Sequence, residues 1–177
     1  VSGDLVQRLR YGENPHQTAS FYKKGFSDFG LTSSKIWQGK ELSYNNINDA
    51  DSAIRLVTEF ASDVACVIIK HANPCGVAIG KTVTEAYLSA FECDKKSAFG
   101  GIIAFNETLD EKAANEVINL FTEVVIAPDL TEAAKRVFRK KKNIRLVTFK
   151  KDKPTNLTDD DIRSVAGGFL VQSQDDL

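Results

Sequence analysis

Residues 64–80 have the sequence VACVIIKHANPCGVAIG, and this stretch decides how the chain folds. The first six residues, 64–69, are apolar and rich in Val and Ile, which is typical of a buried strand. Lys70 and His71 follow, and the turn-forming residues at 73–76 predict a reversal of the chain after them. In open α/β sheets, ligands bind at the carboxyl ends of such strands. A Lys-His pair on a solvated loop is the alternative that the dipeptide alone favours.

Length and composition describe an ordinary globular protein. The 177 residues are enough for one domain with a sizeable core, and the apolar fraction of 42% and charged fraction of 27% are typical of soluble proteins. A net charge of -1 gives no general attraction to nucleic acid or to a membrane, so we expect neither as a partner. No apolar run approaches the length of a membrane span, and no signal peptide opens the chain.

The cysteines indicate a reducing compartment. Cys66, Cys75 and Cys93 are odd in number and widely spaced, which argues against a disulfide framework. We therefore expect a cytoplasmic protein. The sequence starts at Val1 and contains no Met, so we also expect a piece of a longer polypeptide or a processed chain.

Helical and strand patterns alternate along the chain. Apolar runs predict strands at 18–22, 64–69, 102–105, 123–127, 144–149 and 165–172. Apolar residues at helical spacing predict helices at 46–61, 82–93, 108–121 and 129–142. This order predicts an α/β sandwich with a largely parallel sheet, followed by a polar linker at 151–161.

Polar residues at the helix starts are candidate N-caps. They are Asn45, Asn46 or Asn48 for the first helix, Thr82 for the second, Thr108 for the third and Asp129 for the fourth. Thr82 and Glu85 also have the spacing of a capping box. Asp49 and Asp51 suit the positive end of the first helix dipole. A cap explains Asn46 without any ligand.

Two loops carry weaker signals of binding. In the loop after residue 9, Arg10 can hold a phosphate with two hydrogen bonds and Tyr11 can donate another. A surface loop with an aromatic anchor is the alternative that the spacing favours. The two glycines in residues 97–101, SAFGG, let the backbone approach a ligand or simply turn, and they are far short of a dinucleotide fingerprint.

Several chemistries are excluded by missing residues. A zinc deaminase needs H-x-E and P-C-x-x-C, but Asn73 stands two after His71 and Ala78 stands three after Cys75. Two His and three scattered Cys give no plausible tetrahedral zinc set. The P-loop and the serine-hydrolase elbow are also absent from the sequence.

Five motifs together resemble one family, the bifunctional purine-biosynthesis proteins in their bacterial form. They are LRYGENPHQTASFY (9–22), ELSYNNINDADSA (41–53), IIKHANPCGVAIG (68–80), SAFGGIIAFN (97–106) and EVVIAPD (123–129). Members of this family join an AICAR transformylase to an IMP cyclohydrolase. The resemblance runs in order from about residue 9 to residue 172 and covers only the first part of the transformylase region.

The resemblance implies a three-layer α/β/α sandwich, similar to cytidine deaminase but without the zinc site. Residues 1–177 would be the N-terminal subdomain of the transformylase region, with 1–24 as an opening loop and strand and 151–177 as a linker into the next subdomain. It also implies formyl transfer from 10-formyltetrahydrofolate to the 5-amino group of AICAR, no metal, and a homodimer. The cyclohydrolase domain and the folate contacts would lie outside this sequence.

The resemblance implies roles for seven residues. Lys70 and His71 match the catalytic pair, Arg10 and Tyr11 match the residues on the nucleotide 5′-phosphate, Asn46 and Gly100 match nucleotide contacts, and Glu123 matches an acidic residue on the ribose. The AICAR amine is a poor nucleophile, because its lone pair is drawn into the ring and the carboxamide. A histidine can take its proton during attack, and a lysine can stabilise the oxyanion that forms on the formyl group. Neighbouring residues on a strand point to opposite faces, so both can serve one site only where the strand ends.

Three hypotheses remain: an enzyme fragment, a non-catalytic nucleotide-binding module on the same fold, and a structural domain. The presence of both Lys70 and His71 favours the enzyme, because a sensor needs the phosphate contacts but no base. The concurrence of five motifs argues against a purely structural domain.

Overall fold

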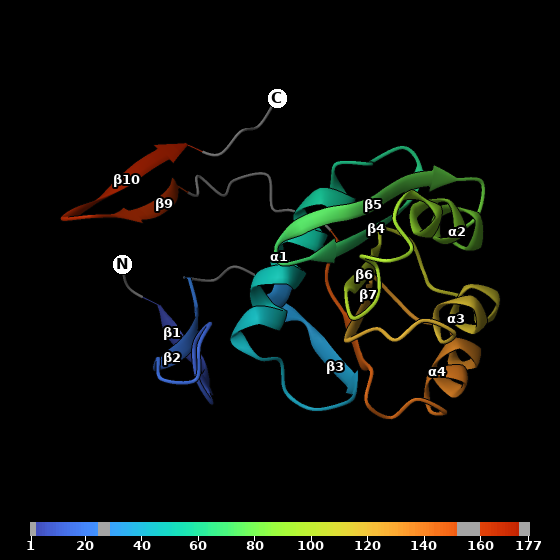
Figure 1. Ribbon diagram of the computed structural model, residues 1–177, viewed down its shortest axis with the longest axis horizontal. Coiled ribbons are helices and arrows are strands. Elements are labelled where there is room, and N and C mark those ends of the chain that lie inside the picture. Colours follow the sequence, from blue (N-terminus) through green and yellow to red (C-terminus); the bar gives the residue numbers. More distant parts are fainter. Residues whose placement is uncertain (1–2, 25–28, 152–159, 174–177) are drawn as a thin grey trace.

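A six-stranded mixed sheet forms the centre of the molecule (Figure 1). The computed structural model describes residues 3–24, 29–151 and 160–173. The strand order is β3 (Lys35–Gln38), β8 (Arg145–Thr148), β7 (Val124–Ala127), β6 (Ile102–Phe105), β4 (Val64–Lys70) and β5 (Asn73–Gly80). The expected α/β class is therefore present.

The expectation of a largely parallel sheet is wrong. Only the pairs β6–β7 and β7–β8 are parallel, while β3–β8, β4–β5 and β4–β6 are antiparallel. The reason is a tight hairpin from β4 into β5, which reverses the chain before the next helix. The crossover from β5 to β6 then passes over β4 and leaves β4 antiparallel to both of its neighbours.

Helices cover both faces of the sheet. They are α1 (Tyr44–Thr58), α2 (Val83–Cys93), α3 (Glu111–Val117) and α4 (Glu132–Phe138), and a 3-10 turn η1 (Gly30–Ser33) precedes β3. Helix α1 packs against one face, and α2, α3 and α4 pack against the other (Figure 1). The last two helices end earlier than the expected 121 and 142. No helix in the described part of the chain has the length and apolar character needed to cross a membrane.

Strand β4 joins the two halves of the core. Its side chains alternate, as a strand requires, with Cys66 and Ile68 packed toward α2 and Val67 and Ile69 packed toward α1. These side chains are at most 1% exposed. The prediction of a buried strand over 64–69 is therefore confirmed.

Three of the four expected N-caps are wrong, each displaced by a nearby residue with a better-placed oxygen. The observed N-caps are Ser43 for α1, Thr82 for α2, Asp110 for α3 and Thr131 for α4. In each case the side-chain oxygen accepts a hydrogen bond from the backbone N–H three residues later, as a cap should. Thr82 is as predicted, but Glu85 accepts from the N–H of Lys81 and not from that of Thr82.

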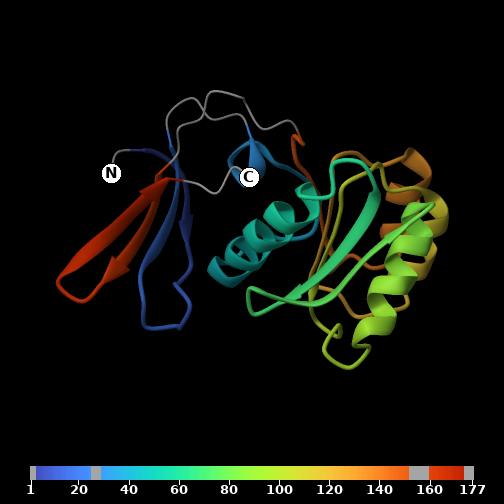
Figure 2. The ribbon, with the colours of Figure 1, turned by 90° about the horizontal axis from the view of Figure 1, so that it is seen from above.

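Two hairpins lie outside the central sheet. Strand β1 (Asp4–Leu9) pairs with β2 (Ala19–Lys23), and β9 (Asp160–Val165) pairs with β10 (Gly168–Ser173). Figures 1 and 2 show both hairpins on the far side of α1 from the sheet. Every residue of β9 and β10 is exposed. Most of the expected linker, from 152 to 159, lies outside the described residues.

Candidate functional site

The chain reverses at the end of β4 through a two-residue turn. Lys70 pairs with Asn73, and only His71 and Ala72 lie between them, with φ angles of 53° and 57°. Positive φ at both positions matches the right-handed twist of a hairpin. The expected turn at 73–76 is wrong, because these residues begin β5. Pro74 is tolerated there because β5 is an edge strand, where a missing N–H costs little.

Lys70 and His71 both lie at the end of the buried strand, as expected. Lys70 is half-buried, and its Nζ donates a hydrogen bond to the carbonyl oxygen of Phe99 at 2.8 Å. His71 is exposed at the tip of the turn, where its carbonyl oxygen accepts from Asn73 Nδ2 at 2.7 Å. The Lys70 side chain is therefore held by the loop before β6, whereas at His71 the printed contact is made by the backbone carbonyl oxygen.

Asn46 and Glu123 are brought into direct contact. Asn46 is buried, 4% exposed, and its Nδ2 donates to Glu123 Oε2 at 2.8 Å. Its Oδ1 accepts from the N–H of Ser43 at 3.2 Å and completes the capping box of α1. Asn46 therefore has two structural roles: its oxygen stabilises the start of α1, and its nitrogen holds the carboxylate of Glu123. Sequence reasoning linked neither residue to the other, because 77 positions separate them.

Gly100 joins this group through the loop before β6. It has a φ of 74°, and its N–H donates to the carbonyl oxygen of Phe121 at 2.8 Å. At the next position, Gly101, an added Cβ would come within 2.9 Å of the carbonyl oxygen of Ile69, so the SAFGG loop needs glycine for close approach to β4. Lys70, Gly100 and Glu123 thus lie at one edge of the sheet, the one formed by the carboxyl end of β4 and the amino ends of β6 and β7.

This edge of the sheet contains the carboxyl end of β4, as expected. The carboxyl end of β4 lies beside the amino ends of β6 and β7, since Ile69 pairs with Ile102 and Ile102 pairs with Val124. The candidate site is therefore at the amino ends of the parallel strands. Lys70 and His71 are at the carboxyl end of their own strand, as expected, and this end meets the amino ends of the parallel strands because β4 runs antiparallel to β6.

Phe99 and Phe121 were not singled out from the sequence, yet they flank this edge. Their ring centroids are 5.1 Å apart, and the residues are 57% and 54% exposed. Their carbonyl oxygens are the ones that bind Lys70 Nζ and the N–H of Gly100. For Phe99, the signal available in the sequence was an aromatic residue directly before two glycines in a predicted turn.

Arg10 and Tyr11 lie apart from the sheet edge, in the loop between β1 and β2. The Arg10 guanidinium is 5.8 Å from the centre of the Tyr11 ring. Among the described residues, neither has a hydrogen bond or ion pair with the five candidate residues at the sheet edge. The hairpin is tied to the start of α1 by Gln7 Nε2, which donates to the carbonyl oxygen of Leu42 at 3.3 Å.

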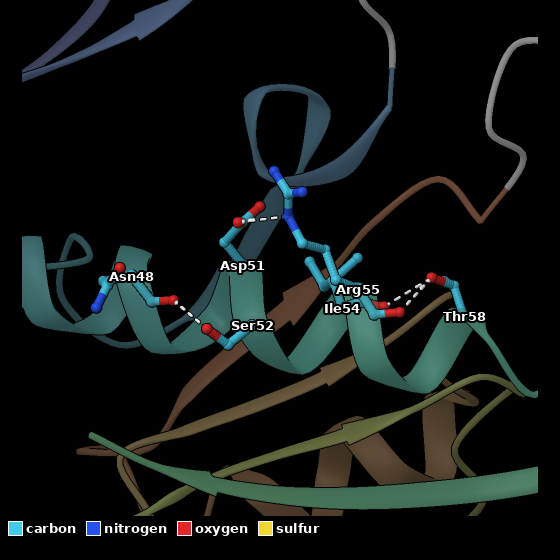
Figure 3. A network of polar contacts seen from close by, with 6 residues as sticks. All are labelled: Asn48, Asp51, Ser52, Ile54, Arg55 and Thr58. Atoms are coloured by element: carbon cyan, nitrogen blue, oxygen red, sulfur yellow. Dashed lines mark hydrogen bonds and ion pairs between the residues drawn. The ribbon is translucent and has the colours of Figure 1, made fainter. Parts of the chain in front are cut away.

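A cleft of about 650 Å³ separates this hairpin from α1. It is lined by β2, η1, the outer side of α1 and the β9–β10 hairpin. On α1, Arg55 Nε forms an ion pair with Asp51 Oδ2 at 2.8 Å, and Ser52 Oγ donates to the carbonyl oxygen of Asn48 (Figure 3). None of the seven candidate residues lines this cleft. It is therefore distinct from the sheet-edge group.

The described residues contain no group of three or more His, Cys, Asp or Glu side chains that could hold a metal ion. Burial raises the pKa of the Cys66 thiol well above its ordinary value. Burial, and then the charge of Asp94, raise the pKa of Cys75. Neither thiol is therefore poised to be a thiolate near neutral pH.

Comparison with known proteins identifies the family. The family model described as "AICARFT/IMPCHase bienzyme" matches residues 1–177. The bifunctional purine biosynthesis protein PurH of Paracoccus denitrificans is 57% identical over 176 residues, covering 98% of this chain and 33% of the relative. PurH of Bartonella bacilliformis is 52% identical with the same coverage. Among solved structures, RibD of Acinetobacter baumannii, form 1, has a TM-score of 0.44 at 12% identity over 53% of this chain and 33% of that chain.

The resemblance carried by the five motifs is confirmed by this match. The chain spans about a third of the length of the curated relatives that it matches. It belongs to the AICARFT/IMPCHase bienzyme family.

Proposed function

We propose that this chain is the first part of the AICAR transformylase region of a bifunctional purine biosynthesis protein. The complete polypeptide would transfer a formyl group from 10-formyltetrahydrofolate to the 5-amino group of AICAR, giving FAICAR, and would also carry IMP cyclohydrolase activity. The observation that carries this proposal is the Lys70–His71 pair at a reversed strand end, beside the Asn46–Glu123 contact, in a chain that matches the family over its whole length.

His71 is the proposed general base. Its exposed place at the tip of the turn leaves the imidazole accessible to a bound substrate, and it would take the proton of the amine as the C–N bond forms. Lys70 is the proposed stabiliser of the oxyanion. A lysine ammonium has three N–H donors, and the described contacts use one of them on Phe99, so two remain for a developing oxygen charge.

The nucleotide would be held by the other five residues. Glu123 has one carboxylate oxygen bound to Asn46, which leaves the second oxygen to accept from a ribose hydroxyl. Gly100 would let the backbone lie close to the nucleotide. Arg10 and Tyr11 would bind the 5′-phosphate, which requires the β1–β2 loop and the sheet edge to bind one ligand together.

Helices on both faces of a mixed sheet support a cytidine deaminase-like α/β/α sandwich, here without a metal. The folate contacts would come from sequence outside this chain, and the complete protein would be a cytoplasmic homodimer. By itself, the chain should bind AICAR weakly and show no detectable formyl transfer.

The test is a steady-state assay of formyl transfer in the full-length polypeptide. Loss of the general base in His71→Ala should lower kcat by roughly two to four orders of magnitude, and Lys70→Ala should be of similar severity. Lys112→Ala, an exposed lysine of α3, is the control and should leave kcat unchanged. Circular dichroism would establish that each variant is folded. Near-normal turnover in a folded His71→Ala protein would refute the assignment, and AICAR binding without turnover in the wild type would favour the nucleotide-binding module.

A further inference from the structure

We infer that Asp49 is a positioning residue, whose carboxylate fixes the His71–Ala72 turn in the conformation that presents His71. The functional part of this inference rests on the proposed role of His71 as the base. The structural part stands on the turn itself and on the contact from α1.

The turn is strained. His71 and Ala72 are the only non-glycine residues with positive φ in the described part of the chain. The left-handed region is unfavourable for L-residues, and two-residue hairpin turns of this kind are usually Asn-Gly or Asp-Gly. Ala72 has neither the freedom of glycine nor a polar side chain that could stabilise the turn locally. Such a conformation persists only where surrounding contacts impose it.

Asp49 supplies the contact. Its Oδ1 accepts a hydrogen bond from the backbone N–H of Ala72 at 2.8 Å, across from α1 to the tip of the β4–β5 hairpin. The acceptor is an ionisable carboxylate and Asp49 is half-buried, so this bond is stronger than one between neutral groups in water. Removing it would return the N–H of Ala72 to solvent and free the turn to relax toward negative φ.

The same part of α1 also holds the other side of the site. Asn46 lies one helical turn before Asp49, so both side chains project from neighbouring positions on the helix. Asn46 binds Glu123 and Asp49 binds the turn. One rigid helix start therefore sets the spacing between the carboxylate proposed for the ribose and the imidazole proposed for the amine. A misplacement of about 1 Å between reacting groups can cost a hundredfold in rate.

The alternative role for Asp49 is a favourable charge near the start of α1, which would affect only stability. The two roles predict different results for the conservative variant. Asp49→Asn removes the charge but keeps an oxygen acceptor for the N–H of Ala72. Asp49→Ala removes both.

The experiment uses the full-length polypeptide and formyl-transfer kinetics. Asp49→Ala should lower kcat by about 10- to 100-fold with little change in KM for AICAR, because ground-state binding does not use His71. Asp49→Asn should keep most of the activity. In a His71→Ala background, Asp49→Ala should cause no further loss, since the residue it positions is gone. The matched control is Asp51→Ala, two positions further along α1. Asp51 forms an ion pair with Arg55, and both residues line the cleft and not the candidate site, so this variant should leave kcat unchanged.

Hydrogen exchange at the Ala72 amide gives a readout that does not depend on activity. Exchange should be faster in Asp49→Ala and close to wild type in Asp49→Asn. If these changes appear in a protein that shows no formyl transfer, the positioning contact stands and the proposed function fails. The inference is overturned if Asp49→Ala leaves exchange unchanged, if it lowers kcat equally in both backgrounds, or if Asp49→Asn is as impaired as Asp49→Ala.

Discussion

The sheet edge and the β1–β2 hairpin both carry residues proposed for one ligand, but they are built very differently. Behind the sheet edge, the side chains of Ile68 and Ile103 are 0% exposed. In the hairpin, Leu5 and Tyr22 are 48% and 56% exposed, and a two-stranded hairpin is at best marginally stable alone. The positions of Lys70, Asn46 and Glu123 are thus fixed by core packing, whereas those of Arg10 and Tyr11 depend on a few contacts.

Because of this difference, we expect substitutions in the two regions to change different properties of the protein. Changes behind the sheet edge should alter folding first and binding as a consequence. Changes in the β1–β2 loop should alter binding alone.

The largest contrast is expected from matched truncations of apolar residues. Ile103→Ala should lower the free energy of unfolding by about 2–5 kcal/mol, because it leaves a cavity between well-packed elements. Leu5→Ala in β1 should change it by less than about 0.5 kcal/mol. Chemical denaturation of both variants, read by circular dichroism, is the measurement. Similar costs at the two positions would show that the hairpin is part of the cooperative core.

Arg10→Ala is expected to affect binding without affecting folding. Loss of its charged hydrogen bonds to phosphate should weaken AICAR binding by about 1.5–3 kcal/mol. Calorimetric titration of the full-length polypeptide with AICAR and with its unphosphorylated riboside is the test, and the riboside should bind both variants alike. If riboside and nucleotide bind the wild type equally well, Arg10 and Tyr11 do not bind the phosphate.

Asn46→Ala should affect both properties, but each modestly. The substitution removes the hydrogen bond from the N–H of Ser43 to Asn46 Oδ1 but keeps the one from the backbone N–H of residue 46 to Ser43 Oγ, so it should cost about 0.5–1.5 kcal/mol of stability. The freed Glu123 should bind the nucleotide less well. Asn45→Ala, at the exposed neighbouring position on the same helix, is the control and should be nearly neutral. Denaturation and calorimetry would be compared for the two. An Asn46→Ala protein with unchanged affinity would mean that Glu123 needs no partner.

The smallest effect is expected in the loop that leads to Gly100. Hydrogen bonds from Ser97 Oγ and from the Ser97 N–H lower the pKa of the Asp94 carboxyl below its ordinary value. A lowered folded-state pKa contributes stability above the ordinary pKa, and this contribution is lost as the pH falls through the lowered one. Ser97→Ala should therefore raise the pKa of Asp94 toward its ordinary value, as followed by NMR titration. The stability difference from wild type should shrink at acid pH, and a pKa that does not move would exclude this contact.

Local sequence patterns were enough to place the four helices, strands β4, β6, β7 and β8, and the family, but they missed strands β3 and β5. Apolar runs without polar interruption located β4 and β6 closely, because every residue of a strand that is buried on both faces has to be apolar. Thr82 was predicted correctly as the N-cap of α2, but the same reasoning misplaced the N-caps of the other three helices by two or more positions, because several polar residues compete at each helix start. The five motifs, matched in order, were enough to identify the family.

The direction of β4, the position of the turn and the neighbours of each site residue became known from the three-dimensional structure. Local patterns specify whether a segment is buried, but strand direction depends on partners far along the chain. Turn propensity misplaced the reversal because Pro74 fits an edge strand, and the positive φ of Ala72 runs against the intrinsic preference of alanine. That conformation is imposed from outside the turn by Asp49, 23 positions away, just as Asn46 meets Glu123 only once α1 has packed on the sheet.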